Sequence, residues 1–349
     1  MSETSHIEHT KWNASISPPL NRADLKSLGT AIGNYRALNL TLPGGIAVTG
    51  IQNIPSSSSV TSPTSRPLIV AFHGGSYECH YFDANPQHTA KIPSDTYGIP
   101  FISLDRPDYG GTSSVLPVPE GSSFPIEEGK RIHEYILPAL WTQHGIPNGC
   151  SCLIILCHSL GSMAGIVAAA LYSQEDTPSY PLGGFIFSGL ADQHQSGIDT
   201  PFPEPNIGAY HFRYPVQGKD SMMFRPGTMD PRILEQSERL NAPIPLPEMR
   251  SLYEYWVHNW KRDWAHRVRV PVMYALPGQD CFFESTAENA QQTMAAFTNS
   301  PRVEGGLVPG APHCMELSHW SHGWYARCFG FALECAAYAA LSAPVQRQS

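Results

Sequence analysis

The chain has 349 residues, of which 42% are hydrophobic and 15% charged, and its net charge is −8. These values are typical of a globular protein with a large core, and they exclude a disordered or fibrous chain. The sequence also lacks a cluster of Lys and Arg, which argues against a nucleic-acid partner because phosphate binding needs concentrated positive charge.

The sequence shows no feature of export or membrane insertion. Residues 1–12 are polar and contain no apolar run behind a basic start, and no later stretch is long and apolar enough to span a bilayer. The 8 cysteines are scattered, and Cys150 and Cys152 have neither the spacing nor the second pair of a zinc site. We therefore predict a cytoplasmic protein with reduced thiols, no metal and no membrane span.

The first elements predicted along the chain form a β-hairpin and a loop. Two short apolar runs, residues 37–42 and 46–54, flank the turn sequence Pro-Gly-Gly at 43–45. Apolar runs on both sides of such a turn favour two antiparallel strands. The stretch 55–67 is rich in Ser, Pro and Thr, which is typical of an exposed loop.

Continuous apolar runs then predict a buried parallel sheet. A strand that is apolar at every position needs cover on both faces, and helices on both sides of a parallel sheet provide it. Helical patterns occur between the runs, and a last strand and a C-terminal helix follow, so the order of elements predicts an α/β fold. The apolar runs are 68–72, 100–104, 152–157, 184–187 and 270–275, the helical patterns are 126–143, 162–172 and 285–297, and the last strand is 302–308.

Residues 191–266 interrupt this alternation. The segment is rich in Pro, Met and aromatic residues and has no clear buried strand. We predict a helical lid inserted between two sheet strands, with residues 1–190 and 267–349 as the core. Met222 and Trp256 are candidate substrate contacts, because Met and aromatic side chains form adaptable apolar surfaces. The alternative is that such side chains pack the lid onto the body.

The candidate nucleophile is Ser159, in the sequence Leu-Cys-His-Ser-Leu-Gly-Ser at 156–162. An apolar strand precedes it and a helix of small residues follows, an arrangement that favours the sharp turn on which a nucleophilic serine lies. The alternative is a serine that caps an ordinary helix. The first glycine of the usual G-x-S-x-G pattern is replaced by Cys157, which is small enough for the turn.

A base and an acid must accompany the serine. His313 follows the last predicted strand in Pro-Gly-Ala-Pro-His and is the candidate base, with His319 and His322 as rivals on the next helix. Asp280 follows the strand at 270–275 and is the candidate acid that orients the histidine. Asp192, one strand earlier, is the alternative. The order Ser, Asp, His is that of hydrolases with this serine turn.

Backbone amides at two loops are the candidate oxyanion hole. The amide of Leu160 directly follows the nucleophile, and that of Gly75 or Ser76 follows the first buried strand. The alternative is that His-Gly-Gly at 73–75 forms only an ordinary turn. His73 and His158 stand beside these positions in the sequence. Together with the two lid residues, Met222 and Trp256, they are the candidate substrate contacts.

These motifs together resemble the α/β-hydrolase superfamily, and they occur in the expected order over most of the chain. The resemblance implies a mostly parallel eight-stranded sheet flanked by helices, a helical cap after the sixth strand and no cofactor. Asp105 is expected to shape a loop, and Asp108 stands where a glycine is usual. The matching pieces are His-Gly-Gly at 73–75, the stretch 104–113, the turn at Ser159, Gly-Gln-Asp at 278–280 and Gly-Ala-Pro-His at 310–313.

The predicted function is hydrolysis of an ester, thioester or lactone of a bulky apolar small molecule, through an acyl-enzyme on Ser159. The same residues could serve acyl transfer or a non-hydrolytic reaction such as C–C cleavage or isomerisation, and a non-catalytic binder of a small ligand is the remaining alternative. The sequence has no glycine-rich nucleotide motif and no aspartate at the nucleophile position. The oligomeric state stays open.

Overall fold

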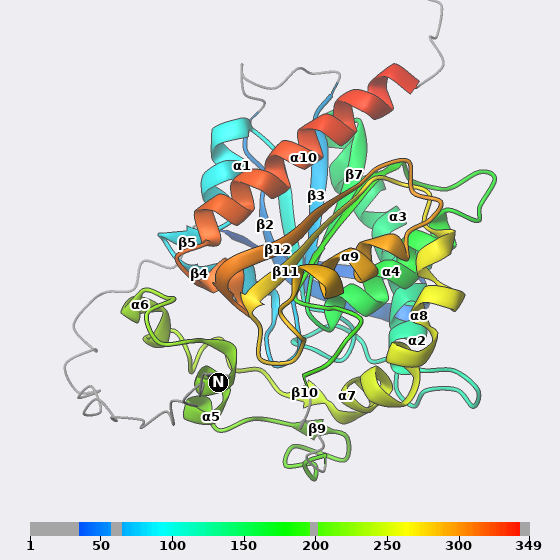
Figure 1. The fold of residues 1–349 in the computed structure, drawn as a ribbon. Helices are drawn as coiled ribbons and strands as arrows, with labels where there is room; N and C mark the ends of the chain where they lie inside the picture. The colour runs from blue at the N-terminus through cyan, green and yellow to red at the C-terminus, as the bar shows by residue number, and fades with distance from the viewer. Residues whose placement is uncertain (1–34, 57–64, 196–201, 343–349) are drawn as a thin grey trace, which may run out of the picture. The chain divides into compact units, whose positions relative to one another are not determined.

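The computed structural model describes residues 35–56, 65–195 and 202–342. Figure 1 shows their fold. The polar residues 1–12 and the middle of the Ser/Pro/Thr-rich loop, 57–64, lie outside the described residues.

An eight-stranded sheet forms the centre of the described chain (Figure 1). Its strand order is β1-β2-β6-β3-β7-β8-β11-β12. β2 pairs antiparallel with both of its neighbours, and every other pairing is parallel. The predicted N-terminal hairpin and the mostly parallel eight-stranded sheet are thereby confirmed. The strands are β1 Arg36–Leu42, β2 Ile46–Asn53, β3 Pro67–Phe72, β6 Phe101–Leu104, β7 Cys152–His158, β8 Leu182–Ser188, β11 Val272–Gln279 and β12 Val303–Pro312.

The central strands are buried on both faces. In β3, Leu68, Val70 and Phe72 belong to one hydrophobic cluster, while Ile69 and Ala71 belong to another on the opposite face. Successive side chains of a strand point to opposite faces, so a strand between two clusters must be apolar throughout. Each fully buried large aliphatic or aromatic side chain contributes about 1.5–3 kcal/mol to stability.

Helices cover both faces of the sheet. Residues of α4 pack in the first cluster and residues of α10 in the second, and Figure 1 shows α10 crossing the strands. The predicted helix at 126–143 lies in a continuous helical stretch that includes two π-helical turns, and the short elements between β3 and β6 were not predicted. The helical elements of the body are η2 Pro43–Gly45, η3 Cys79–Phe82, α1 Lys91–Tyr97, α2 Phe124–Arg131, η4 Ile132–Ile136, α3 Leu137–Leu140, η5 Trp141–Gly145, η6 Ile146–Asn148, α4 Gly161–Tyr172, α9 Ala287–Ala295, η9 Met315–Leu317 and α10 Ser321–Ser342, with a small hairpin of β4 Asp83–Asn85 and β5 His88–Thr89.

The described residues between β8 and β11 contribute no strand to the large sheet. These residues, 189–195 and 202–271, form short helices and one two-stranded sheet. Figure 1 shows most of this segment beyond the ends of the large sheet's strands. Its elements are β9 His211–Phe212, α5 Val216–Met223, α6 Pro231–Leu234, β10 Ile244–Pro245, α7 Leu246–Ser251, η7 Leu252–Trp256, α8 Val257–Asp263 and η8 Ala265–Arg267.

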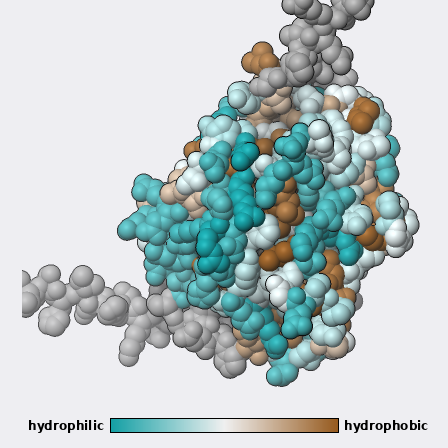
Figure 2. Space-filling model, turned by 90° about the vertical axis from the view of Figure 1, so that its right-hand side faces the viewer, coloured by the Kyte–Doolittle hydropathy of each residue, from teal (hydrophilic) through white to brown (hydrophobic). Residues whose placement is uncertain are grey.

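The face in Figure 2 is mainly hydrophilic, with small separate hydrophobic groups. Among the described helices, none combines the length and the apolar character needed to cross a bilayer. All 8 cysteines are free.

Candidate active site

Ser159 lies at the sharp turn between β7 and α4. Its φ is 50°, a left-handed conformation that residues other than glycine seldom adopt. The Ser159 amide donates to the carbonyl of Ser188 at the end of β8 (2.7 Å), and the Ser162 amide donates to the Ser159 carbonyl (2.8 Å). Such a strained turn between strand and helix lifts the serine hydroxyl clear of the backbone.

Gly161 shows why a small residue is needed two positions after the serine. A Cβ atom there would lie 2.4 Å from the carbonyl oxygen of His73 and 3.2 Å from that of Phe72. The loop after β3 thus approaches the turn after β7 backbone to backbone, and only glycine permits this approach.

Cys157 replaces the glycine expected two positions before the serine, and Gly165 on α4 accommodates it. The Cys157 side chain is fully buried. A Cβ atom on Gly165 would lie 2.5 Å from the Cys157 sulfur and 2.9 Å from Cε2 of Phe185. The missing side chain at position 165 therefore gives the sulfur its space.

Replacing Gly165 with alanine is expected to destabilise the protein by about 1–3 kcal/mol, because the added methyl group overpacks the contact between α4 and β7. In a Cys157→Ala background the same change should cost less, because the sulfur is gone. Urea unfolding of the wild type, both single variants and the double variant measures this coupling.

Gly330→Ala on α10 is the matched control, since a Cβ atom there meets nothing within 4 Å. Alanine in an open helical position is expected to stabilise by up to about 1 kcal/mol. A coupling energy of zero between positions 157 and 165 would contradict this account of the turn.

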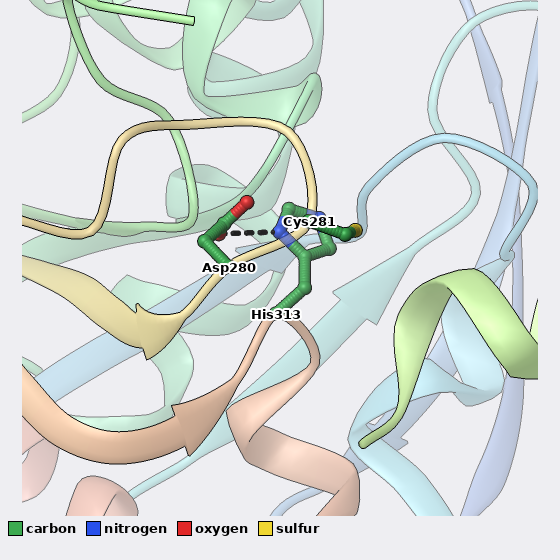
Figure 3. A group of neighbouring side chains, drawn as sticks. All are labelled: Asp280, Cys281 and His313. Carbon is green, nitrogen blue, oxygen red and sulfur yellow. Dashed lines mark hydrogen bonds and ion pairs between the residues drawn. The ribbon is translucent and has the colours of Figure 1, made fainter. Parts of the chain in front are cut away.

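The side chains of Ser159, His313 and Asp280 form one chain of hydrogen bonds. Nε2 of His313 lies 3.0 Å from Oγ of Ser159, and Nδ1 lies 2.7 Å from Oδ2 of Asp280. Figure 3 shows the second contact, between side chains of the loops that follow β11 and β12. Their exposed fractions are 7%, 2% and 1%. In this arrangement an imidazole can accept the hydroxyl proton while the carboxylate fixes its tautomer.

The structure brings Asp280, not Asp192, to the imidazole. The second carboxylate oxygen of Asp280 accepts hydrogen bonds from the amides of Phe282 (2.8 Å) and Phe283 (3.2 Å), which fix its orientation. Asp192 instead forms an ion pair with Lys261 at 2.7 Å. The rival histidines at positions 319 and 322 are both exposed.

A cavity of about 60 Å³ opens beside Ser159. Among the described residues that line it, none carries a charge, and most are aliphatic or aromatic. Mainly apolar cavities with a few polar groups beside a reactive side chain are typical binding sites for small molecules. The aromatic pair Phe282-Phe283, which begins two residues after Asp280, was an unused sequence signal for this lining. The lining residues are Gly75, Ser76, Ser159, Leu160, Tyr214, Met223, Ile244, Met249, Leu252, Tyr253, Phe282 and Phe283.

The candidate oxyanion donors all line this cavity. Gly75 and Ser76 follow β3, Leu160 follows the nucleophile, and Ser76 has a left-handed φ of 64°. Within the described part of the chain, no group accepts a hydrogen bond from these three amides. Unpaired amides beside the serine hydroxyl are suited to a developing negative charge on a substrate oxygen.

His158 does not contact the cavity, contrary to the expectation. It is fully buried, its ring stacks on Tyr81 at 4.8 Å, and its Nδ1 lies 3.0 Å from Oγ of Ser188. Burial, and next the neighbouring His313, lowers the pKa of His158 well below its usual value. The last residue of β7, directly before the nucleophile, is therefore part of the core.

His73 is also an interior residue and not a lining residue. Its Nε2 accepts a hydrogen bond from the amide of Arg106 (3.2 Å), and its ring meets that of Tyr109 edge to face at 4.8 Å. Burial, and next the positive charge of Arg106, lowers the pKa of His73. His73 thus joins the loops after β3 and β6.

The two residues of the segment 191–266 that were expected to contact the substrate also lie outside the cavity lining. Met222 is half-buried at the end of α5, and its neighbour Met223 lines the cavity instead. Trp256 stacks on Trp260 with ring centroids 6.3 Å apart and packs in the core, whereas Tyr253 lines the cavity. Here the aromatic residue packs the segment onto the body, which was the alternative.

Comparisons with known proteins support the fold at low sequence identity. No protein-family model and no curated protein matches the chain. A thioesterase domain from the curacin biosynthetic pathway superposes with a TM-score of 0.53 at 13% identity, over 86% of this chain and 99% of that one. A putative lipase from Acinetobacter baumannii superposes with a TM-score of 0.56 at 13% identity, over 87% of this chain and 93% of the lipase. An N-acyl homoserine lactonase complexed with N-hexanoyl homoserine superposes with a TM-score of 0.54 at 16% identity, over 86% of this chain and 97% of the lactonase.

The protein has the α/β-hydrolase fold. The strand order and the structural neighbours agree on this point, and the resemblance read from the sequence is confirmed at the level of the fold. Likeness at 13–16% identity carries no information on the substrate.

The loop after β6 explains the second departure from the usual motif of this fold. Asp108 has a φ of 72°, a conformation that glycine adopts freely and aspartate tolerates. Its carboxylate accepts hydrogen bonds from the Ser114 hydroxyl (2.5 Å) and the Val115 amide (2.9 Å). Asp105 is structural as expected, because it accepts from the Cys79 amide (2.8 Å).

Asp280, Cys281 and His313 place three potential metal-ligand atoms within 4.8 Å of one another. Figure 3 shows the cysteine sulfur on the side of the imidazole away from the carboxylate. The direct hydrogen bond between the carboxylate and the imidazole accounts for the closeness of these two groups, so the cluster is part of the candidate site.

A buried polar network joins the body of the protein to the segment before β11. The Arg106 guanidinium donates to Glu128 on α2 (2.7 Å) and to Glu248 on α7 (2.6 Å), and the Tyr109 hydroxyl donates to the same Glu248 carboxylate (2.5 Å). All four side chains are buried. Burial raises the pKa of Glu128 to about 8. Breaking a buried pair costs about 3–5 kcal/mol, so the network fixes α7 to the body.

Proposed function

We propose that this protein is a serine hydrolase that cleaves the ester, thioester or lactone bond of a bulky apolar small molecule. The observation that carries the proposal is the hydrogen-bonded chain of Ser159, His313 and Asp280 beside an uncharged, mainly apolar cavity. The triad geometry supports nucleophilic catalysis, because a serine hydroxyl needs an adjacent base and the base needs an orienting partner.

In the acylation step, Nε2 of His313 takes the proton of Ser159 while Oγ attacks the substrate carbonyl carbon. The carbonyl oxygen becomes an oxyanion that accepts hydrogen bonds from the amide of Leu160 and that of Gly75 or Ser76. The imidazolium then donates its proton to the leaving oxygen or sulfur as the bond to the carbonyl carbon breaks. The acyl group stays on Ser159.

In the deacylation step, a water molecule attacks the acyl carbon while His313 takes one of its protons. The collapse of the second tetrahedral intermediate returns the proton to Oγ of Ser159 and releases a carboxylic acid. Asp280 stabilises the imidazolium in both steps without itself becoming protonated.

The cavity supports an apolar acyl group as the bound part of the substrate. Tyr214, Met223, Met249 and Phe283 offer apolar surface, and each methylene group that leaves water contributes about 0.8 kcal/mol. We propose that residues 191–266 form a lid over this group, since Tyr214 to Tyr253 supply about half of the lining. A lid that excludes water strengthens the electrostatic interactions beneath it.

A fluorophosphonate probe tests the proposed chemistry. The Ser159 oxygen is expected to displace fluoride from phosphorus and form a stable covalent adduct, because His313 removes the hydroxyl proton. Intact-protein and peptide mass spectrometry should place one adduct on Ser159 and none on the Ser159→Ala variant.

Ser162→Ala is the matched control, because Ser162 is a buried serine three positions further along the same turn. It should be labelled as the wild type is. A wild type that stays unlabelled while correctly folded would favour a non-catalytic binder. For esters that the enzyme turns over, hydrolysis in H₂¹⁸O must place the label in the released acid, and its absence would favour acyl transfer or a non-hydrolytic reaction.

A further inference from the structure

A buried lysine lies directly behind the candidate oxyanion site. Lys219 on α5 is 2% exposed. Its ammonium group donates to the carbonyl of Ser76 and to that of Leu240, the latter at 2.5 Å, and it lies 3.6 Å from the centroid of the Tyr77 ring. A side chain from the segment between β8 and β11 therefore contacts the backbone of the loop after β3.

The described contacts of the ammonium group are mainly with uncharged groups. Among the described carboxylates, none forms an ion pair with Lys219, although Asp220 and Glu78 are near enough to act on it electrostatically. Burial lowers the pKa of Lys219 to about 7, while Cys314, Asp220 and Glu78 raise it and Arg213 lowers it. A buried cation held mainly by two carbonyls and an aromatic ring is costly for folding alone.

Ser76 is the residue whose conformation this lysine controls. A left-handed φ of 64° is unfavourable for serine. Two donors hold its carbonyl in this conformation, the Lys219 ammonium and the amide of Ala242 (3.1 Å). Ser76 itself lines the cavity, and its amide is one of the candidate oxyanion donors.

The position of Lys219 on its helix supports a link to the site. Met223 lies four residues later on α5 and lines the cavity. Residues at this spacing share one face of a helix. The face of α5 that supplies cavity lining therefore also supplies the ammonium group that holds Ser76.

We propose that Lys219 is a positioning residue of the oxyanion site, which holds the Ser76 carbonyl so that the Ser76 amide faces the substrate oxygen and adds positive charge behind it. This inference rests on the proposed serine hydrolase function. The role is electrostatic as well as geometric, because a charge fixed in a dry site acts on a developing oxyanion without reorganisation.

Lys219→Met should lower kcat by about 10–1,000-fold, with KM changed by less than about threefold, since loss of one oxyanion donor has effects of this order. Affinity for an apolar trifluoromethyl ketone, which forms a tetrahedral adduct with Ser159, should fall by the same factor as kcat/KM. Affinity for the product acid should stay constant. A purely structural role would not make the loss of affinity for the ketone equal to the loss of kcat/KM.

Three controls make the comparison specific. Lys261→Met removes a lysine of α8 that pairs with Asp192 and lies outside the cavity lining, and it should behave as the wild type does. Rates are expressed per site titrated with the fluorophosphonate, so partial unfolding does not count as lost activity. Lys219→Gln keeps a hydrogen-bond donor without the charge and provides the same test if the methionine variant does not fold.

The pH dependence separates the charge from the geometry. The ammonium form is present below pH 7 and the neutral amine above it, because the pKa is lowered to about 7. The ratio of wild-type to Lys219→Met kcat/KM, which reports the free enzyme, should therefore be largest near pH 6 and should decline towards pH 9. Taking the ratio cancels the titration of groups common to both proteins.

The inference is overturned if folded Lys219→Met or Lys219→Gln turns over like the wild type per titrated site, or if ketone affinity is unchanged. It is also overturned if KM alone rises, which would make Lys219 a part of substrate binding. Failure of the proposed function itself is seen separately, as a wild type that the fluorophosphonate does not label at Ser159.

Discussion

Replacing Ser159 with alanine is expected to lower kcat for an apolar ester such as p-nitrophenyl hexanoate by about a million-fold. The hydroxyl is the atom that would carry the acyl group, and removal of a triad serine has an effect of this order. A residual rate about 10³–10⁴-fold above that in water should remain, because the oxyanion donors and the cavity still bind the transition state. Stopped assays at high enzyme concentration with product detection by chromatography can measure it.

Ser162→Ala is again the control for this measurement, and circular dichroism should show the same fold in all three proteins. Alanine has the same Cβ atom as serine at this left-handed position, so the variant removes only the hydroxyl group. A Ser159→Ala enzyme that retained more than about 1% of wild-type kcat would show that another group is the nucleophile.

Asp280→Asn is expected to lower kcat by about 10⁴-fold while the protein stays folded. An amide can hold the imidazole in place, but it favours the wrong tautomer and cannot stabilise the imidazolium. Steady-state kinetics of Asp280→Asn and Asp192→Asn, with the same ester, give the comparison.

Asp192→Asn is the matched variant, because the sequence offered both aspartates as the acid. Asp192 forms an ion pair with the partly exposed Lys261, so its loss should leave kcat unchanged and alter the free energy of unfolding by less than about 1 kcal/mol. The reverse result, a large loss for Asp192→Asn alone, would assign the acid to the earlier strand and refute the hydrogen-bonded arrangement described above.

The sheet could be predicted because burial on both faces leaves a local signature. Runs such as 68–72 and 152–157 are apolar at every position, and they are strands in the structure. The turn at Ser159 could be predicted for a related reason, since a strained junction requires small residues that stand out in the sequence. The compensation of Cys157 by Gly165 could not, because it depends on a contact between two elements.

The cavity lining was harder to predict, because it depends on which face of each element meets the site. Met222 and Met223 differ by one residue, which is about 100° of helix rotation, and only the second lines the cavity. The segment 191–266 has no regular apolar period, so nothing in the sequence fixes that rotation. His73 and His158 lie next to site residues in the chain, but they are core residues in the structure.

Lys219 was missed for a physical reason as well. A lone lysine in a polar-looking helix is usually exposed, and its burial depends on two carbonyls, at positions 76 and 240, that come from distant parts of the chain. No local pattern carries that information.

The buried ion pair between Arg106 and Glu248 affects which acyl chains the cavity can hold. α7 and the turn after it carry Met249, Leu252 and Tyr253, and displacing them means breaking this ion pair, at a cost that exceeds what one or two extra methylene groups contribute. That side of the cavity is therefore expected to be rigid. It is expected to set the longest acyl chain that fits the proposed active site.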